Sequence, residues 1–267
     1  MKKKIRGNVL AIISPKGGVG KTVTTSNLAI ALSTVYNKKI LAIDTNVTTA
    51  SLGFHFNLIY PGVTIYDVLR KDFSIRDAIY KYNENLDIIP ASIVIEKQDE
   101  SMGAMQKNVK RIVNHFDILL SQLVADYDLV LLDAAGGFST ESIAAMGIAD
   151  GLLLVTNPEY PAILATAKCI EYAKIAKVPM CGIVLTKVNG KKYEITRLEI
   201  ETALKVQVIG EVPFDTNIGK AISEKVPVMV FKPYSKASVA YKQLAGMIID
   251  HKYEPGILDK IRGILRV

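Results

Sequence analysis

The chain has 267 residues, of which 49% are hydrophobic and 22% charged, and its formal net charge at pH 7 is +7. This length suits one large α/β domain with a buried core, and no apolar run reaches the roughly 18–20 residues of a membrane-spanning helix. Two cysteines, Cys169 and Cys181, provide neither a disulfide framework nor a metal-binding spacing, which favours a cytoplasmic location. The mild positive charge permits binding to anionic lipid or nucleic acid without demonstrating either.

Apolar runs alternate with helical patterns along the chain. The first run follows a basic start, is too short for a secretory signal and predicts a strand. The predicted strands are Val9–Ser14, Lys39–Asp44, Leu86–Pro90, Leu129–Asp133, Gly151–Thr156, Met180–Thr186 and Val206–Val212. The predicted helices are Thr22–Tyr36, Thr64–Leu69, Met105–Asp126, Ser139–Ala149, Tyr160–Ala176, Ile195–Leu204, Thr216–Lys225 and Lys236–Lys252. This order predicts an α/β fold with a doubly wound, mostly parallel sheet and helices on both faces.

A glycine-rich loop between the first strand and the first helix carries the strongest functional signal. Its glycines let backbone N–H groups point inward to form an anion site, and the following helix adds the positive end of its dipole. Lys21 can reach the β- and γ-phosphates of a nucleotide, and the hydroxyl of Thr22 can bind Mg²⁺. The loop therefore predicts a nucleoside triphosphate site made by Lys16, Gly17, Gly18, Val19, Gly20, Lys21, Thr22 and Val23.

Two residues of this loop depart from the general phosphate-loop pattern. Pro15 stands where that pattern has its first glycine, and Lys16 adds a second lysine. The loop thereby resembles the deviant Walker A motif of the MinD/ParA family of ATPases, and the segment from Phe231 to Ser238 is most similar to archaeal MinD-like proteins. In that family the extra lysine contacts the nucleotide of a partner subunit, so the resemblance implies that Lys16 reads a neighbour's ATP in a homodimer. The alternative is that Lys16 is a solvated surface lysine.

Two predicted strands end in an aspartate. Asp133 follows an apolar run in the manner of a Walker B site, where it can hold Mg²⁺ through water opposite Thr22. Asp44 ends the second strand, and the residues after it resemble the family's switch I, which implies that Asp44 lies near the Mg²⁺ ion. Residues 134–137 resemble switch II, although the usual proline after the aspartate is absent.

Asn46 is a second departure from the family. The usual switch I motif has an aspartate at this position, which orients the attacking water. An amide can hydrogen-bond that water but cannot accept its proton, and losing such a group typically costs ~10²–10⁴-fold in rate. We therefore expect slow ATP hydrolysis and a long-lived ATP-bound dimer. The alternative is that Mg²⁺ and Lys16 determine the rate of ATP hydrolysis and that position 46 simply tolerates asparagine.

Three later strand ends, after which Asn157, Lys187 and Pro213 stand, resemble those of the family, and the last two of them frame the adenine base there. The resemblance, which covers roughly residues 8–250, implies ATP-binding roles for Asn157, Lys187, Pro213 and Asp215.

The last residues form a separate pattern, which divides the chain into an ATPase domain (1–252) and a C-terminal tail (253–267). At ~100° per residue the tail predicts an amphipathic helix with basic side chains beside its apolar face, which suits a lipid headgroup layer. The position matches the membrane-targeting helix of MinD. One tail should bind weakly, and two tails held in a dimer more tightly. The alternative is packing on its own domain or another chain. The apolar face consists of Ile257, Leu258, Ile261, Ile264 and Leu265.

Taken together, the resemblance implies an Mg²⁺- and ATP-dependent dimerising ATPase that controls membrane association and positions partner proteins. We expect a cytoplasmic protein that associates peripherally with an anionic membrane in its ATP state and binds an unidentified activator or cargo. The alternative is a ParA-like ATPase that binds DNA non-specifically through Lys232, Lys236 and Lys242. A metabolic enzyme is disfavoured, because the three histidines are scattered and no nucleophile–base pair is evident.

Overall fold

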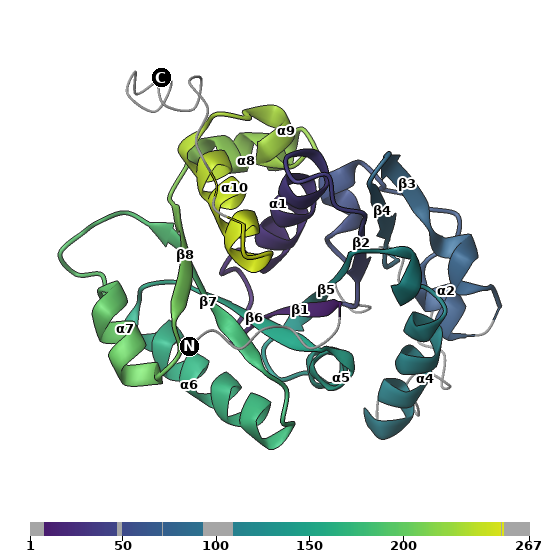
Figure 1. The fold of residues 1–267 in the computed structure, drawn as a ribbon, viewed down its shortest axis with the longest axis horizontal. Helices are drawn as coiled ribbons and strands as arrows, with labels where there is room; N and C mark the ends of the chain where they lie inside the picture. Colours follow the sequence, from purple (N-terminus) through teal and green to yellow (C-terminus); the bar gives the residue numbers. More distant parts are fainter. Residues whose placement is uncertain (1–7, 47–49, 71, 93–108, 252, 254–267) are drawn as a thin grey trace.

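The computed structural model describes residues 8–46, 50–70, 72–92, 109–251 and 253. Within them, eight strands form one sheet in the order β3-β4-β2-β5-β1-β6-β7-β8 (Figure 1). All neighbouring pairs are parallel except β3–β4. The strands are β1 (Val9–Ser14), β2 (Ile40–Asp44), β3 (Tyr80–Asn83), β4 (Leu86–Ile89), β5 (Leu129–Gly136), β6 (Gly151–Thr156), β7 (Met180–Val188) and β8 (Val208–Pro213).

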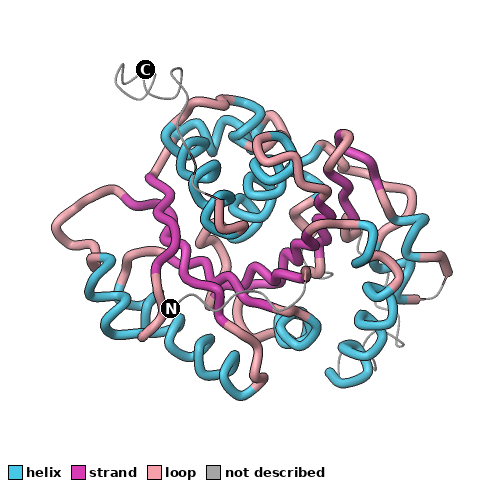
Figure 2. Tube along the Cα trace, in the orientation of Figure 1, coloured by secondary structure: helices cyan, strands magenta, loops and turns pink. Residues whose placement is uncertain are grey.

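Helices cover both faces of this sheet, as Figure 2 shows by the magenta strands between two helical layers. One layer contains α1 (Lys21–Thr34), α8 (Thr216–Ser223), α9 (Val228–Phe231) and α10 (Lys236–Ile248). The other contains α2 (Ile65–Leu69), α4 (Val109–Ser121), α5 (Thr140–Ile148), α6 (Tyr160–Ile175) and α7 (Arg197–Leu204). The predicted doubly wound α/β architecture is confirmed.

Burial on both faces explains the nearly continuous apolar runs of the central strands. Along β5, Val130 and Leu132 point into the core beneath α4 and α5, whereas Leu129 and Leu131 point into the core beneath α1. Because alternate side chains of a strand face opposite sides, a strand covered twice must be apolar at nearly every position.

The structure departs from the sequence prediction mainly at the edges. The antiparallel strand β3 was not predicted, because its four residues are half-exposed or exposed and show no apolar run. The short helix α9 was also missed. The long predicted helix Met105–Asp126 appears as α4 followed by the 3-10 helix η3 (Val124–Asp126), and residues 105–108 lie outside the described residues.

The predicted membrane-binding residues of the tail also lie outside the described residues, which reach the segment 253–267 only at Tyr253. In the part of the chain that the structure describes, no helix is long and apolar enough to cross a bilayer.

The topology determines where a ligand can bind. Strand β1 lies between β5 and β6, and its carboxyl end leads into the glycine-rich loop. In open parallel sheets, ligands bind outside the carboxyl ends of the strands, at the point where the order of the strands in the sheet reverses. The loop predicted to hold phosphates is therefore at the expected position.

Candidate functional site

The glycine-rich loop opens onto a pocket of about 840 Å³. Gly18 and Gly20 have φ angles of 77° and 95°, a left-handed conformation that side chains disfavour. Gly20 is the N-cap of α1 and provides no side-chain cap, so the first N–H groups of that helix remain available to a ligand. The loop and the helix start therefore form an anion site of the kind that binds nucleotide phosphates.

Side chains from β7 hold the back of this loop. The Nζ of Lys187 donates a hydrogen bond to the carbonyl of Gly18 at 2.8 Å, and the hydroxyl of Thr186 donates to the carbonyl of Val19. The amide of Asn157 in turn donates to both oxygens of Thr186 at 3.0 Å. Because these groups take up the carbonyls, the loop can direct its N–H groups inward.

Two aspartates lie beneath the start of α1. Asp44 and Asp133 occupy paired positions of β2 and β5, and both are fully buried. Asp133 accepts hydrogen bonds from Thr22 Oγ1 at 2.7 Å and from Lys21 Nζ at 3.3 Å. It also accepts one from the hydroxyl of Thr25.

Asp44 is held by backbone groups instead. It accepts hydrogen bonds from the N–H groups of Asn46, Ser51 and Leu52, which belong to the segment predicted as switch I. Burial, and secondly the charge of Asp133, raise the pKa of Asp44 to about 7, although these hydrogen bonds lower it. Asp44 therefore titrates near neutral pH, and a nearby cation would favour its ionised form.

This set of oxygens fits a Mg²⁺ ion that arrives with a nucleotide. The hydroxyl of Thr22 and the carboxylates of Asp44 and Asp133 are hard oxygen donors of the type that Mg²⁺ prefers. Within the described residues, no group of three or more His, Cys, Asp or Glu side chains could hold a metal on its own. Phosphate oxygens would therefore have to complete the shell, as is usual for Mg²⁺ in nucleotide sites.

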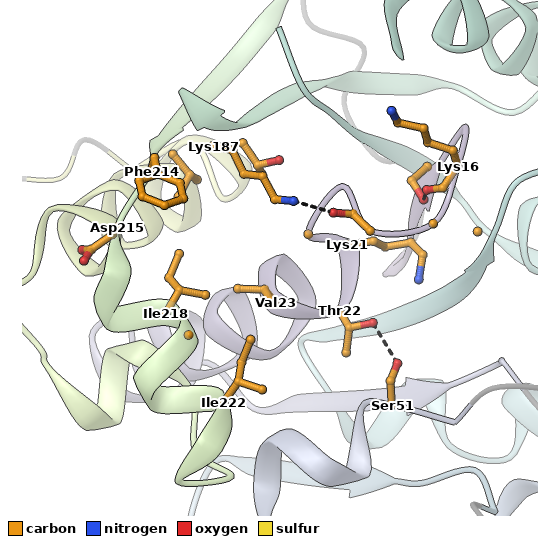
Figure 3. A pocket seen from close by; sticks show the side chains of 18 of the residues that line it. Lys16, Lys21, Thr22, Val23, Ser51, Lys187, Phe214, Asp215, Ile218 and Ile222 are labelled. Carbon is orange, nitrogen blue, oxygen red and sulfur yellow. Dashed lines mark hydrogen bonds between the residues drawn. The ribbon is translucent and has the colours of Figure 1, made fainter. Parts of the chain in front are cut away.

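Lys16 points away from the phosphate end of its own pocket. Figure 3 shows its amine directed to the opposite side of the loop from the amine of Lys21. Its Nζ lies 3.8 Å from the carboxylate of Glu159, and its side chain is 46% exposed. An exposed ion pair of this kind contributes at most about 1 kcal/mol, so Lys16 can leave Glu159 at little cost.

The other end of the pocket is apolar and is formed by β8 and α8. Phe214, Ile218 and Ile222 face Val23 of α1 across this space, which suits a flat base (Figure 3). Ile218 and Ile222 were not predicted from the sequence, whereas Phe214 lies between the predicted residues Pro213 and Asp215. The four-residue spacing of Ile218 and Ile222 shows that they share one face of α8, but not that this face borders a pocket.

Asp215 lines this end without offering a free carboxylate. It accepts hydrogen bonds from the backbone and side chain of Asn217 and from the N–H of Ala237. Burial raises its pKa, but these hydrogen bonds outweigh burial and leave the pKa below its usual value. Asp215 thus caps α8 and holds the start of α10.

The structure brings most of the predicted site residues to one pocket. Asp44 and Asp133 are buried beneath this pocket. The loop residue Val19 and the strand-end residue Asn157 are also buried and do not line the pocket. The predicted residues that line the pocket are Lys16, Gly17, Gly18, Gly20, Lys21, Thr22, Val23, Asn46, Lys187, Pro213 and Asp215.

A glycine-rich loop that joins a central parallel strand to a helix, with lysine, threonine and an aspartate of the neighbouring strand around it, defines a P-loop nucleotide-binding protein. Residues 7–178 match the family model described as an AAA domain. The chain is 36% identical over 240 residues to an uncharacterised ATP-binding protein of Methanocaldococcus jannaschii, covering 90% of this chain and 87% of the relative. It is 29% identical over 254 residues to the septum site-determining protein MinD of Thermotoga maritima, covering 91% and 88%.

Solved structures agree with these relatives. The cell division ATPase MinD of Pyrococcus furiosus superposes with a TM-score of 0.81 at 28% identity, covering 91% of this chain and 99% of that one. The MinD protein of Pyrococcus horikoshii, solved with Mg-ADP, superposes with a TM-score of 0.80 at 27% identity, covering 97% and 98%. The chain belongs to the MinD/ParA family, as its sequence predicted.

The raised pKa of Asp44 predicts a pH-dependent stability. Below the ordinary pKa of 3.8 both folded and unfolded Asp44 are protonated; between that value and about 7 only the folded form keeps its proton. The stability of the wild type should therefore fall relative to Asp44→Asn as the pH rises from about 4 to about 7, by at most about 1.4 kcal/mol per unit. Above about pH 7 the difference should level off.

Denaturant unfolding at a series of pH values measures this difference. Asp72→Asn is the matched control, because that carboxylate is half exposed and lies beside Arg70. Parallel pH profiles for the wild type and Asp44→Asn would contradict the assignment.

Proposed function

We propose that this protein is an Mg²⁺- and ATP-dependent dimerising switch that hydrolyses ATP slowly and positions partner proteins at a membrane. The observation that carries this proposal is the direction of Lys16. Its amine is directed to the other side of the loop from the amine of Lys21 and forms an exposed ion pair with Glu159. A lysine so placed can reach a nucleotide presented by a second subunit.

In this proposal the two lysines of the loop bind the phosphates of different nucleotides. Lys21 is buried against Asp133 at the start of α1 and serves the subunit's own nucleotide. Lys16 serves the nucleotide of the partner, so the homodimer forms only when triphosphates are bound. Electrostatic stabilisation by a cation supplied from a neighbour is a well-attested way to promote phosphoryl transfer.

Hydrolysis is slow in this proposal because the chain lacks an acid at position 46. Asn46 is buried, lines the pocket and donates its backbone N–H to Asp44. It can orient a water but cannot take its proton. A slow cycle keeps the ATP-bound dimer assembled for longer.

Membrane attachment rests on the sequence pattern of the tail. Burying one aliphatic side chain contributes about 1.5–3 kcal/mol, and ordering each tail residue costs about 1–2 kcal/mol. A single tail is therefore a weak anchor, and pairing two tails in a dimer raises their effective concentration. Relatives named for septum placement and cell division support a role in positioning other proteins, such as an activator or cargo.

The second candidate function is non-specific DNA binding of the ParA type. Lys232 and Lys236 are exposed and could contact phosphates. Lys242, the third predicted contact, is buried, and its amine lies 4.8 Å from the centre of the Tyr234 ring. This removes one of three cations and favours the membrane proposal. A salt-sensitive, ATP-dependent gel shift with double-stranded DNA would favour the alternative.

Replacing Lys16 should separate nucleotide binding from dimerisation. With Mg²⁺ and a non-hydrolysable ATP analogue, light scattering should show a dimer for the wild type and a monomer for Lys16→Ala. Both should bind the analogue with similar affinity, since the amine of Lys16 is directed away from that of Lys21 and pairs with Glu159. Lys38→Ala, at an exposed pair with Asp128, should behave like the wild type. A wild type that stays monomeric, or a variant that still dimerises, would refute the switch.

Restoring the acid at position 46 tests the slow cycle. Asn46→Asp should raise steady-state phosphate release, within the ~10²–10⁴-fold range of a general base. Asn46→Ala is the matched control and should not gain activity, because it removes the amide without adding an acid. An unchanged or lower rate for Asn46→Asp would mean that Mg²⁺ and Lys16 carry the reaction.

Truncation tests the membrane anchor. The full-length chain should co-sediment with anionic liposomes in ATP but not in ADP, and a chain of residues 1–254 should not co-sediment in either. Ile261→Asn, on the apolar face, should weaken sedimentation, whereas Asp259→Asn, on the polar face, should not. Equal sedimentation of the full-length and truncated chains would show that the tail does not anchor the protein.

A further inference from the structure

Two hydroxyl groups meet at the metal end of the pocket. The Oγ of Ser51, from the switch I segment, lies 3.0 Å from the Oγ1 of Thr22, from the first turn of α1. Figure 3 shows the two side chains pointing toward one another, and both line the pocket. Ser51 was not among the residues predicted from the sequence.

The neighbouring groups determine which hydroxyl donates. A hydroxyl has one proton to give and two lone pairs. Asp133 faces the ammonium of Lys21 and accepts the hydroxyl proton of Thr25, so it acts as an acceptor on this side of the site. Thr22 therefore gives its only proton to Asp133, at 2.7 Å. It follows that the hydroxyl of Ser51 donates its proton to a lone pair of Thr22 Oγ1. Both residues line the pocket.

The backbone holds Ser51 in this position. The N–H groups of Ser51 and Leu52 both donate to Oδ2 of Asp44, each at 2.9 Å. Ser51 thus connects Asp44 through its backbone to Thr22 through its side chain. It lies between two of the three protein groups that fit a Mg²⁺ ion.

The distance between the hydroxyls suits a shared cation. Magnesium binds oxygen at about 2.0–2.1 Å in near-ideal octahedral geometry, so adjacent ligands lie about 2.9 Å apart. The two oxygens are 3.0 Å apart. Rotation of the Ser51 hydroxyl about its C–O bond would turn a lone pair toward the cation without any movement of the oxygen.

We propose that Ser51 is a ligand of the nucleotide-bound Mg²⁺ ion. This inference rests on the proposed function, because the metal arrives with the nucleotide. When the site holds Mg²⁺, the oxygen of Ser51 binds the metal beside Thr22 and its proton turns outward. Without the metal, the same hydroxyl donates to Thr22. Switch I thereby supplies a side-chain ligand of its own.

Removing the hydroxyl gives opposite results for the two roles that Ser51 can have. If Ser51 is a ligand, Ser51→Ala should weaken Mg²⁺ binding to the nucleotide complex, because one of its oxygen ligands has gone. If Ser51 only donates to Thr22, the same substitution should leave Mg²⁺ binding unchanged or tighten it, because a competitor for the lone pair has gone. Titration of Mg²⁺ against the complex with a fluorescent, non-hydrolysable ATP analogue measures this affinity.

A thiol at this position tests direct contact. Ser51→Cys should bind Mg²⁺ more weakly than the wild type and Cd²⁺ more tightly, because a sulfur ligand prefers the softer ion. Equal changes for both ions would contradict direct ligation. Ser121→Ala is the control, since that hydroxyl caps the carbonyl of Ile118 at the end of α4. It should leave binding of both metals unchanged.

The wild type separates this inference from the proposed function. If the wild type binds the analogue equally well with Mg²⁺ and with a chelator, the metal-dependent switch fails. If the wild type requires Mg²⁺ and Ser51→Ala requires it to the same degree, only the assignment of Ser51 fails.

Discussion

Two buried carboxylates at paired positions are the constraint on which the site depends. Asp44 and Asp133 lie side by side on β2 and β5 with no exposure to solvent, and charges so placed must be compensated by nearby donors. Asp133 receives those donors from the first turns of α1, and Asp44 receives them from the switch I backbone. The raised pKa of Asp44 shows that this compensation is incomplete. A divalent cation would complete it. The two aspartates thereby connect the start of α1, which contacts Asp133, with the switch I backbone, which contacts Asp44.

The same loop places two lysines in opposite environments. Lys21 is the first residue of α1, and its buried amine lies 3.3 Å from the carboxylate of Asp133. Lys16 precedes the glycines, and its carbonyl accepts the hydroxyl proton of Ser14 while its amine extends to Glu159. Between the two lysines, Gly18 and Gly20 adopt left-handed φ angles of 77° and 95°. The opposite environments of Lys21 and Lys16 are what the proposed division between a subunit's own phosphates and those of a neighbour requires.

How far the sequence predicts this structure depends on whether the signal is local. Strands β1 and β6 have the predicted bounds, because apolar residues bounded by a loop define them without reference to the rest of the chain. The phosphate loop and the aspartates after two apolar runs were found for the same reason, although β5 continues past Asp133 to Gly136. Tertiary packing decides the rest. The apolar wall requires α8 to lie against α1, β3 exists through its pairing with β4, and Lys242 is covered through its contact with Tyr234.

Contacts along β5 connect the metal end of the pocket to the loop that carries Lys16. Asp133 lies three residues before Gly136, and a Cβ at Gly136 would come within 3.0 Å of the backbone nitrogen of Gly17. The N–H of Gly137 also donates to the carbonyl of Ser14 at 3.0 Å. Because close-packed interiors transmit displacements, a shift of Asp133 toward a bound cation would act on the residues next to Lys16. The loop that carries Lys16 is thus the direct neighbour of the strand that carries Asp133.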